Sequence, residues 1–386
     1  MARSARTVIW VVGLLLISLG CGRMGFDGLG EYAVVESESH LGIESISDSA
    51  KLAVLEDGVA LAWLNQGLPD EDPNLWYQKL DLDGSLNGDP QLLATRVRNT
   101  VMTGVGSSLA MAYVFESPEG RRIGLRMLED GALGEEQVIS DVGGTDYDWP
   151  LELVSDGRHL ALTYHDAHEV YARVMDTKGQ GLTPVVQLTN DPWMYDAPSA
   201  ALNFNSVAVV WTDERWDDDV FFARMTLGGL KIVHTVPIAS APGDSWSARI
   251  VCDGLGYRVM WIDEREGQER IMWAKVDDLG QAMGEAQTLA LGDTPKRVEF
   301  LRLADDRFGV FWLDDDRLWF ALIDAEGKVL AGDMAVSSVD ATVSNFQVRG
   351  IGLDVMVLSQ ESLLEWDGQA WVSGPEQMAL RRLVFH

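Results

Sequence analysis

An apolar segment that ends in an aromatic residue recurs through this chain at intervals of about fifty residues. The copies read ALAWLN, AMAYVF, ALTYHD, AVVWTD, RVMWID and GVFWLD, with their aromatic residues at Trp63, Tyr113, Tyr164, Trp211, Trp261 and Trp312. These residues lie 50, 51, 47, 50 and 51 positions apart, and a weaker seventh copy, DVMVLSQ, surrounds Leu358. A fixed period of this length indicates a repeat architecture, in which each unit buries its apolar face against its neighbours.

Each unit contains four short segments in the same order. An alternating segment such as LELVSDG comes first, and the aromatic segment follows it. A third segment leads into a D-x-x-G turn, as in ARVMDTKG, and a shorter fourth segment such as VVQLTND completes the unit. Alternation with a period of two, interrupted by glycine turns, indicates antiparallel strands. The sequence therefore predicts an all-β fold, a seven-bladed β-propeller of four-stranded antiparallel blades, with six blades as the alternative.

A strand from one of the two termini has to close the ring of blades. The repeat places the blades near residues 49–98, 99–147, 148–195, 196–243, 244–292, 293–339 and 340–386. The run Tyr32-Ala33-Val34-Val35 can add a strand to the last blade, which we favour, or residues 380–385 can complete it alone. The strand aromatics are expected to fill the wedges between neighbouring blades, and we assign them no chemical function.

Two of the repeats carry a motif that resembles a known group of proteins. The segments Trp211-Thr212-Asp213-Glu214-Arg215 and Trp261-Ile262-Asp263-Glu264-Arg265 resemble the W-x-D-x-R repeats of secreted bacterial propellers. The resemblance covers about 340 residues of the chain. It implies a propeller fold and no particular activity, because one fold supports many functions.

Residues 1–20 have the features of a signal peptide. Arg3 and Arg6 precede an apolar stretch over residues 8–19, which is too short to span a bilayer as a helix. The stretch LISLGC, which ends at Cys21, resembles the lipobox of bacterial lipoproteins. The resemblance implies that Cys21 carries acyl chains such as palmitate and that residues 21–30 tether a single domain, 31–386, to the membrane. Because Gly22 is not Asp, it also implies the outer membrane of the cell envelope, with plain secretion as the alternative.

The charge of the chain restricts its partners. The formal net charge is −30, from 60 acidic and 30 basic residues. A phosphate backbone requires a basic face, so we expect no nucleic-acid partner. Anionic lipid surfaces repel such a chain as well, so membrane contact is expected through the N-terminal lipid only. We expect the protein to be a monomer.

An acidic residue stands directly before the first strand of six units. These residues are Asp48, Asp148, Asp196, Asp244, Asp293 and Asp340, with Asn99 at the same place in the second unit. The first strand of a propeller blade lines the central channel, so the carboxylates are predicted to form a ring near one mouth of that channel. They either form Asx-turns with the backbone or bind a hard cation such as Ca²⁺, and the two functions are compatible.

The loops expected beside this ring are both acidic and aromatic. Aromatic rings beside carboxylates suit sugars, through stacking and hydrogen bonds, or cationic ligands. An ordinary solvated acidic rim is the alternative. The predicted ligand-binding residues are Trp149, Trp193, Tyr195 and Trp246 in the loops before first strands, and Asp213, Asp263 and Asp314 after the strand aromatics.

No catalytic motif accompanies these features. The chain contains no G-x-S-x-G, no H-E-x-x-H and no phosphate-binding loop. We therefore expect a lipid-anchored envelope propeller that binds an envelope protein or a glycan through its acidic, aromatic loop face. The alternatives are a polysaccharide hydrolase that uses two of the rim carboxylates and a purely structural envelope protein.

Overall fold

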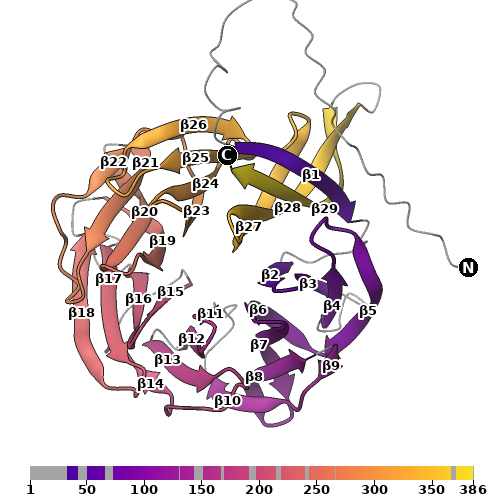
Figure 1. The fold of residues 1–386 in the computed structure, drawn as a ribbon, viewed down its shortest axis with the longest axis vertical. Coiled ribbons are helices and arrows are strands. Elements are labelled where there is room, and N and C mark those ends of the chain that lie inside the picture. The colour runs from indigo at the N-terminus through magenta and orange to yellow at the C-terminus, as the bar shows by residue number, and fades with distance from the viewer. Residues whose placement is uncertain are drawn as a thin grey trace, which may run out of the picture.

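Seven antiparallel sheets form a ring around a central opening (Figure 1). This computed structural model describes residues 33–41, 50–65, 73–129, 131–142, 151–166, 169–190, 197–213, 219–239, 243–265, 267–366 and 371–385. Every regular element in these ranges is a β-strand, and none of the described residues forms a helix suited to crossing a membrane. The predicted seven-bladed propeller is confirmed, and the six-bladed alternative is wrong.

Blades 1 to 3 follow one another from the N-terminal side. The strands of blade 1 are β2 (Lys51–Leu55), β3 (Gly58–Asn65), β4 (Asn74–Leu80) and β5 (Leu86–Ala94). Those of blade 2 are β6 (Val97–Val105), β7 (Ser108–Ser117), β8 (Gly120–Glu129) and β10 (Gln137–Val142), with the short β9 (Ala132–Leu133) beside β8. Those of blade 3 are β11 (Leu151–Ser155), β12 (His159–Asp166), β13 (Glu169–Asp176) and β14 (Val186–Gln187).

Blades 4 to 6 repeat the same order, from an inner strand to an outer one. The strands of blade 4 are β15 (Ser199–Asn203), β16 (Ser206–Asp213), β17 (Asp219–Thr226) and β18 (Lys231–Ala239). Those of blade 5 are β19 (Ser245–Cys252), β20 (Tyr257–Arg265), β21 (Gln268–Val276) and β22 (Gln287–Leu289). Those of blade 6 are β23 (Arg297–Arg302), β24 (Phe308–Asp314), β25 (Arg317–Ile323) and β26 (Val329–Ala335).

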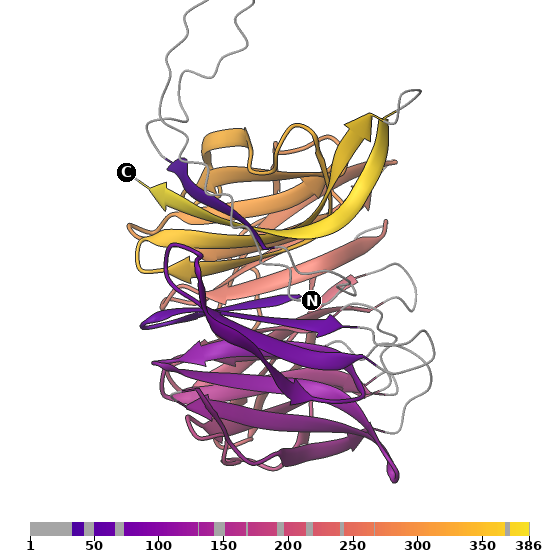
Figure 2. The ribbon, with the colours of Figure 1, turned by 90° about the vertical axis from the view of Figure 1, so that its right-hand side faces the viewer.

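Blade 7 joins the two ends of the chain. It contains β27 (Ala341–Ile351), β28 (Asp354–Trp366), β29 (Trp371–Phe385) and, as its outer strand, β1 (Ala33–Leu41). Figure 2 shows β1 beside the yellow strands of this blade. The favoured closure by an N-terminal strand is confirmed.

A buried arginine connects three strands of blade 7. The guanidinium of Arg381, on β29, lies 3.0 Å from a carboxylate oxygen of Glu361 on β28 and 2.9 Å from Glu38 on β1. The side chains of Arg381 and Glu361 are 1% and 0% exposed. The closing sheet is therefore held by a polar contact as well as by its backbone ladder.

The strand aromatics lie between the blades, as predicted. All six are at most 5% exposed. Tyr113 packs against the apolar residues of blade 1, and Trp261 packs against Ala208 and Val210 of blade 4. In the seventh unit, Leu358 lies in the cluster between blades 7 and 1. Each aromatic ring brings a large apolar area to a wedge that backbone hydrogen bonds cannot fill.

The D-x-x-G turns have a common geometry that explains their sequence. At the turn after β13, the Asp176 carboxylate accepts hydrogen bonds from the backbone N–H groups of Lys178 and Gln180, at 2.9 and 2.8 Å. Gly179 has a φ of +78°, a region that L side chains rarely adopt. The third strands of blades 5 and 6 end in the same way at Asp277 and Asp324, whereas Thr226 takes the place of the aspartate in blade 4.

Candidate functional site

The loops that lead into the inner strands lie beside the loops that join the second and third strands of the same blade. In blade 6, a carboxylate oxygen of Asp314 accepts hydrogen bonds from the backbone N–H groups of Asp293 and Thr294, at 2.6 and 3.2 Å. In blade 5, the Glu264 N–H donates to the carbonyl oxygen of Asp244 at 2.8 Å. Both sets of loops therefore form one face of the ring in these blades.

The aspartates of the W-x-D motif are buried in this face. Asp213, Asp263 and Asp314 are 3%, 2% and 7% exposed. Asp263 forms an ion pair with Arg265 of the same motif, with an N–O distance of 2.6 Å. The motif thus fixes the path of its own loop, and direct contact of these carboxylates with a ligand stays a prediction.

The aspartates that precede the inner strands are only partly described. Asp48, Asp148 and Asp196 lie outside the described residues. Asp244, Asp293 and Asp340 are exposed, and the last of these accepts a hydrogen bond from the Leu364 N–H through its backbone carbonyl. Within the described ranges no group of three or more His, Cys, Asp or Glu side chains is arranged to hold a metal ion. A Ca²⁺ ring stays a prediction.

The predicted aromatic platform is represented in the described residues by Trp246 alone. Trp149, Trp193 and Tyr195 lie outside these residues, as does Cys21. Trp246 is half-buried on β19, and its indole N–H donates to the carbonyl oxygen of Lys296 at 3.1 Å. This bond ties blade 5 to the loop before β23.

An acidic and aromatic cleft opens on the loop face of blade 6. Its volume is about 480 Å³. Burial and the neighbouring carboxylates of Asp293 and Asp314 raise the pKa of Asp333. A second cleft of about 450 Å³ shares three of these residues, Ala290, Gly292 and Asp293, and extends to Glu264 and Glu269 in blade 5. The lining of the first cleft is Ala290, Gly292, Asp293, Trp312, Asp314, Trp319 and Asp333.

The seven inner strands present one side chain each to the central channel at the same register. In blades 1 to 6 that residue pairs with the one directly before the strand aromatic, and in blade 7 it pairs with Leu358. We call this set the channel ring. Its members are Lys51, Val101, Glu152, Ser199, Arg249, Glu299 and Gln347.

Channel-ring side chains join neighbouring blades across a gap that the sheets themselves do not bridge. The Leu52 N–H donates to the amide oxygen of Gln347 at 2.8 Å, and the Ala200 N–H donates to the Glu152 carboxylate at 2.6 Å. An inner strand is an edge strand, so half of its backbone groups need partners from outside the sheet. These side chains supply some of those partners.

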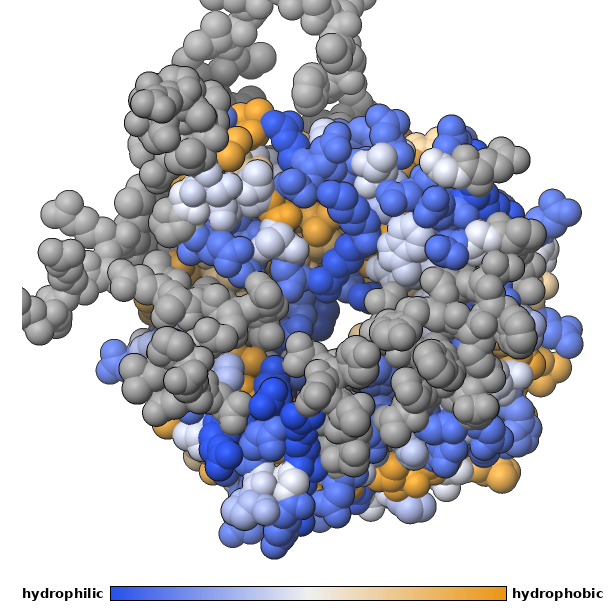
Figure 3. Space-filling model, turned by 180° about the vertical axis from the view of Figure 1, so that it is seen from behind, coloured by the Kyte–Doolittle hydropathy of each residue, from blue (hydrophilic) through white to orange (hydrophobic). Residues whose placement is uncertain are grey.

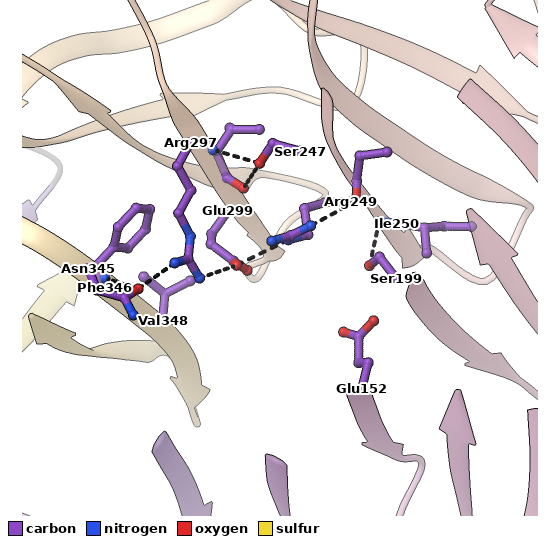
Figure 4. A network of polar contacts seen from close by, with 12 residues as sticks. Glu152, Ser199, Ser247, Arg249, Ile250, Arg297, Glu299, Asn345, Phe346 and Val348 are labelled. Carbon is purple, nitrogen blue, oxygen red and sulfur yellow. Dashed lines mark hydrogen bonds and ion pairs between the residues drawn. The ribbon is translucent and has the colours of Figure 1, made fainter. Parts of the chain in front are cut away.

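Charged side chains meet in the same channel (Figure 4). The Arg249 and Arg297 guanidinium groups lie 3.1 and 3.3 Å from one carboxylate oxygen of Glu299. Arg297 also donates to the amide oxygen of Asn345 and lies over the Phe346 ring, 5.3 Å from its centroid. Figure 4 shows the Glu152 carboxylate directed toward this chain of contacts from β11.

The channel shifts the pKa of three of its groups in different directions. Burial, reinforced by the charge of Glu299, raises the pKa of Glu152 to about 7. Burial alone would also raise that of Glu299, but the nearby Arg249, Arg297 and Arg349 outweigh it and lower the pKa to about 2. Burial, together with repulsion from Arg297 and Arg349, lowers the pKa of Lys51 to about 8. The two channel carboxyl groups therefore differ in charge near neutral pH.

Sequence reasoning missed the channel ring. The aspartates before the inner strands can be recognised because one residue type recurs there, whereas the residue type of the channel ring changes from each blade to the next. A positional signal was nevertheless available. Ring residues stand twelve positions before the strand aromatic in the first five units and thirteen before it in the sixth.

Comparisons with known proteins support the fold and no particular activity. No protein-family model matches the chain, and no curated protein matches it. Among solved structures, it is similar to polysaccharide lyase Uly1, with a TM-score of 0.54 and 8% identity over 88% of this chain and 90% of that chain. At such identity the likeness shows the propeller fold alone.

Two further solved structures are similar at the same level. One is the β-propeller domain of the Trilobed protease from Pyrococcus furiosus, with a TM-score of 0.50 and 11% identity over 85% of this chain and 96% of that chain. The other is a puromycin-hydrolysing peptidase from Mycobacterium tuberculosis, with a TM-score of 0.52 and 14% identity over 86% of this chain and 55% of that chain. The propeller is thus a scaffold that polysaccharide-acting and peptide-hydrolysing proteins share.

Proposed function

We propose that this chain is a lipid-anchored envelope propeller that binds a protein or glycan partner through its acidic, aromatic loop face. The cleft of blade 6 carries this proposal, because it sets the half-buried indole ring of Trp319 beside the exposed carboxyl groups of Asp293 and Asp333 in one concave surface. Indole rings offer stacking surface to sugars and cations, and carboxylates accept hydrogen bonds from hydroxyl and ammonium groups.

The binding proposal is tested with a glycan array and with basic peptides as probes. The double variant Asp293→Asn and Asp333→Asn removes two carboxylates from the cleft and keeps their shape. Asp305→Asn is the matched control, because that side chain is 85% exposed and lies outside the cleft. We expect the double variant to weaken binding about tenfold or more, since each lost charged hydrogen bond costs about 1.5–3 kcal/mol. Equal binding by both variants contradicts the proposal.

The membrane anchor is a separate part of the proposal and rests on the lipobox resemblance at Cys21. Cells fed an alkyne analogue of palmitate should label the natural chain, and the label should be absent from the Cys21→Ala variant. The variant should also leave the outer-membrane fraction. A labelled variant would contradict lipidation at this residue.

A polysaccharide hydrolase is the second candidate, because the cleft places Asp333 near two other carboxyl groups. The raised pKa of Asp333 keeps its proton available to higher pH than an ordinary aspartate, as a general acid requires. Release of reducing ends from envelope polysaccharide, lost in Asp333→Asn, would favour this function over binding alone.

A further inference from the structure

The central channel is rich in cationic groups although the chain as a whole is acidic. Its cavity of about 110 Å³ is lined by residues of all seven blades. Four of the lining side chains are basic and two are acidic, whereas the whole chain has a formal net charge of −30. In the space-filling view from behind, hydrophilic residues border the hollow centre of the ring (Figure 3). The charged lining residues are Lys51, Glu152, Arg249, Arg297, Glu299 and Arg349.

The contacts among these groups leave the basic side chains in excess over the carboxylates that they contact. Glu299 is the carboxylate that both Arg249 and Arg297 contact. Arg349 donates to the carbonyl oxygen of Val348 at 2.8 Å, and its charge also lowers the pKa of Glu299. Four basic side chains thus face two acidic ones around this cavity, so an anion from outside the chain would be stabilised here.

The behaviour of Lys51 gives a second sign of positive potential. Its pKa is lowered to about 8, and after burial the main causes are repulsion from Arg297 and Arg349. Glu299 acts in the opposite direction but is outweighed. An anion placed among these cations would remove part of that repulsion.

We propose that the central channel binds a small organic carboxylate, held mainly by Arg349 and Lys51 from the adjoining blades 7 and 1. A guanidinium group binds a carboxylate through two parallel hydrogen bonds, and an ammonium group adds a point charge. The cavity suits a small molecule, or the acidic group of a larger one, because all seven inner strands confine it.

Two observations favour a carboxylate over a phosphate or sulfate. The first is Glu152, which faces the same cavity and retains a proton in part of the molecules near neutral pH, because its pKa is about 7. A protonated carboxyl group can donate a hydrogen bond to a carboxylate ligand. The second is the acidity of the whole chain, which repels a dianion more strongly than a monoanion.

The binding should depend on pH through the groups that face the cavity. These are Glu152 and Lys51, with Arg249, Arg297, Glu299 and Arg349 around them. Below about pH 7 Glu152 is neutral and Lys51 is charged, so a carboxylate ligand is favoured. Above about pH 8 Glu152 is charged and Lys51 is neutral, so the affinity for a carboxylate ligand should fall.

This site is independent of the proposed partner-binding face. Asp293, Asp314 and Asp333 line the cleft of blade 6, and none of them lines the channel cavity. The two proposals can therefore fail separately, since each has its own variants.

Isothermal titration of the full chain in detergent tests the proposal with glucuronate as the probe. Glucose is the matched neutral ligand, because it differs only in a hydroxymethyl group where glucuronate has its carboxylate, and sulfate is the competing anion. We expect saturable binding of glucuronate at pH 6, weaker binding at pH 9, and no binding of glucose. Binding of glucose as strong as that of glucuronate, or displacement of glucuronate by sulfate at equal concentration, would overturn carboxylate recognition.

Two variants assign the site to the channel. Arg349→Gln and Lys51→Gln should each weaken glucuronate binding about tenfold or more, because each removes a charged contact. Arg302→Gln is the matched control, since Arg302 lies on β23 with 41% of its side chain exposed and pairs with Asp306 instead. A melting curve shows whether each variant is folded. If Arg349→Gln does not fold, Lys51→Gln alone tests the assignment. Unchanged affinity in a folded variant would overturn the assignment.

Discussion

Replacement of Arg381 by leucine should lower the free energy of unfolding of the propeller more than the same replacement of an exposed arginine. The guanidinium lies between Glu361 and Glu38, and both Arg381 and Glu361 are almost completely inaccessible to water. In Arg381→Leu the Glu361 carboxylate keeps its burial and loses its cation. Such a broken buried pair costs about 3–5 kcal/mol, against a total stability of about 5–15 kcal/mol for a typical domain.

The double variant Arg381→Leu with Glu361→Leu separates the ion pair from simple packing. Replacement of both partners by apolar residues is often neutral or stabilising, so the double variant should be more stable than either single one. Urea unfolding followed by tryptophan fluorescence gives the free energies for a double-mutant cycle, in which we expect a coupling of at least about 2 kcal/mol. Arg302→Leu, at an exposed pair, should cost less than about 1 kcal/mol. A double variant as unstable as Arg381→Leu would refute the reasoning.

The other predictions concern the wedges, the channel and the contact between blades 1 and 2. Trp261→Ala should lower the unfolding free energy by about 3–5 kcal/mol, because the ring is fully buried, whereas an effect under about 1 kcal/mol would contradict its wedge function. Glu152 has its pKa raised from 4.5 to about 7, so it stabilises the fold below pH 4.5 and that contribution is lost as the pH rises through 7. The melting temperature of Glu152→Gln, relative to that of the natural chain, should therefore rise as the pH is raised from about 5 to about 8. A constant difference in melting temperature would contradict the raised pKa. Gly104→Ala should destabilise by about 1–3 kcal/mol in urea unfolding, because its Cβ would lie 1.9 Å from the Val54 carbonyl oxygen. Gly350→Ala, whose nearest neighbour would be 3.9 Å away, should be nearly neutral, and equal losses in the two variants would contradict the steric argument.

The fold could be predicted because its information is local and repeated. Each strand aromatic, each alternating segment and each D-x-x-G turn can be recognised within about ten residues, and the period multiplies the signal. The closure by the N-terminal strand could be proposed from an apolar run and the need to complete the last blade. The ion pair between Glu38 and Arg381 in this blade could not be proposed, because the two residues are 343 positions apart and no local pattern pairs them.

The channel site could not be predicted for a different physical reason. Lys51, Glu152 and Arg249 stand at equivalent places in their blades, but the residue type changes from each blade to the next. Their proximity arises only when seven sheets close into a ring. A search for recurring residues favours structural positions, whereas a ligand site in a repeat protein breaks the repeat.

The position of β1 in blade 7 has a consequence for how the protein is made. Ala33 pairs with Phe385, so β1 gains its partner only after β29, the last of the described strands, has been synthesised. Until then the strand is an open edge that can pair with other chains. A ring closed in this way cannot be completed before β29 has been synthesised, which delays the most non-local step of folding.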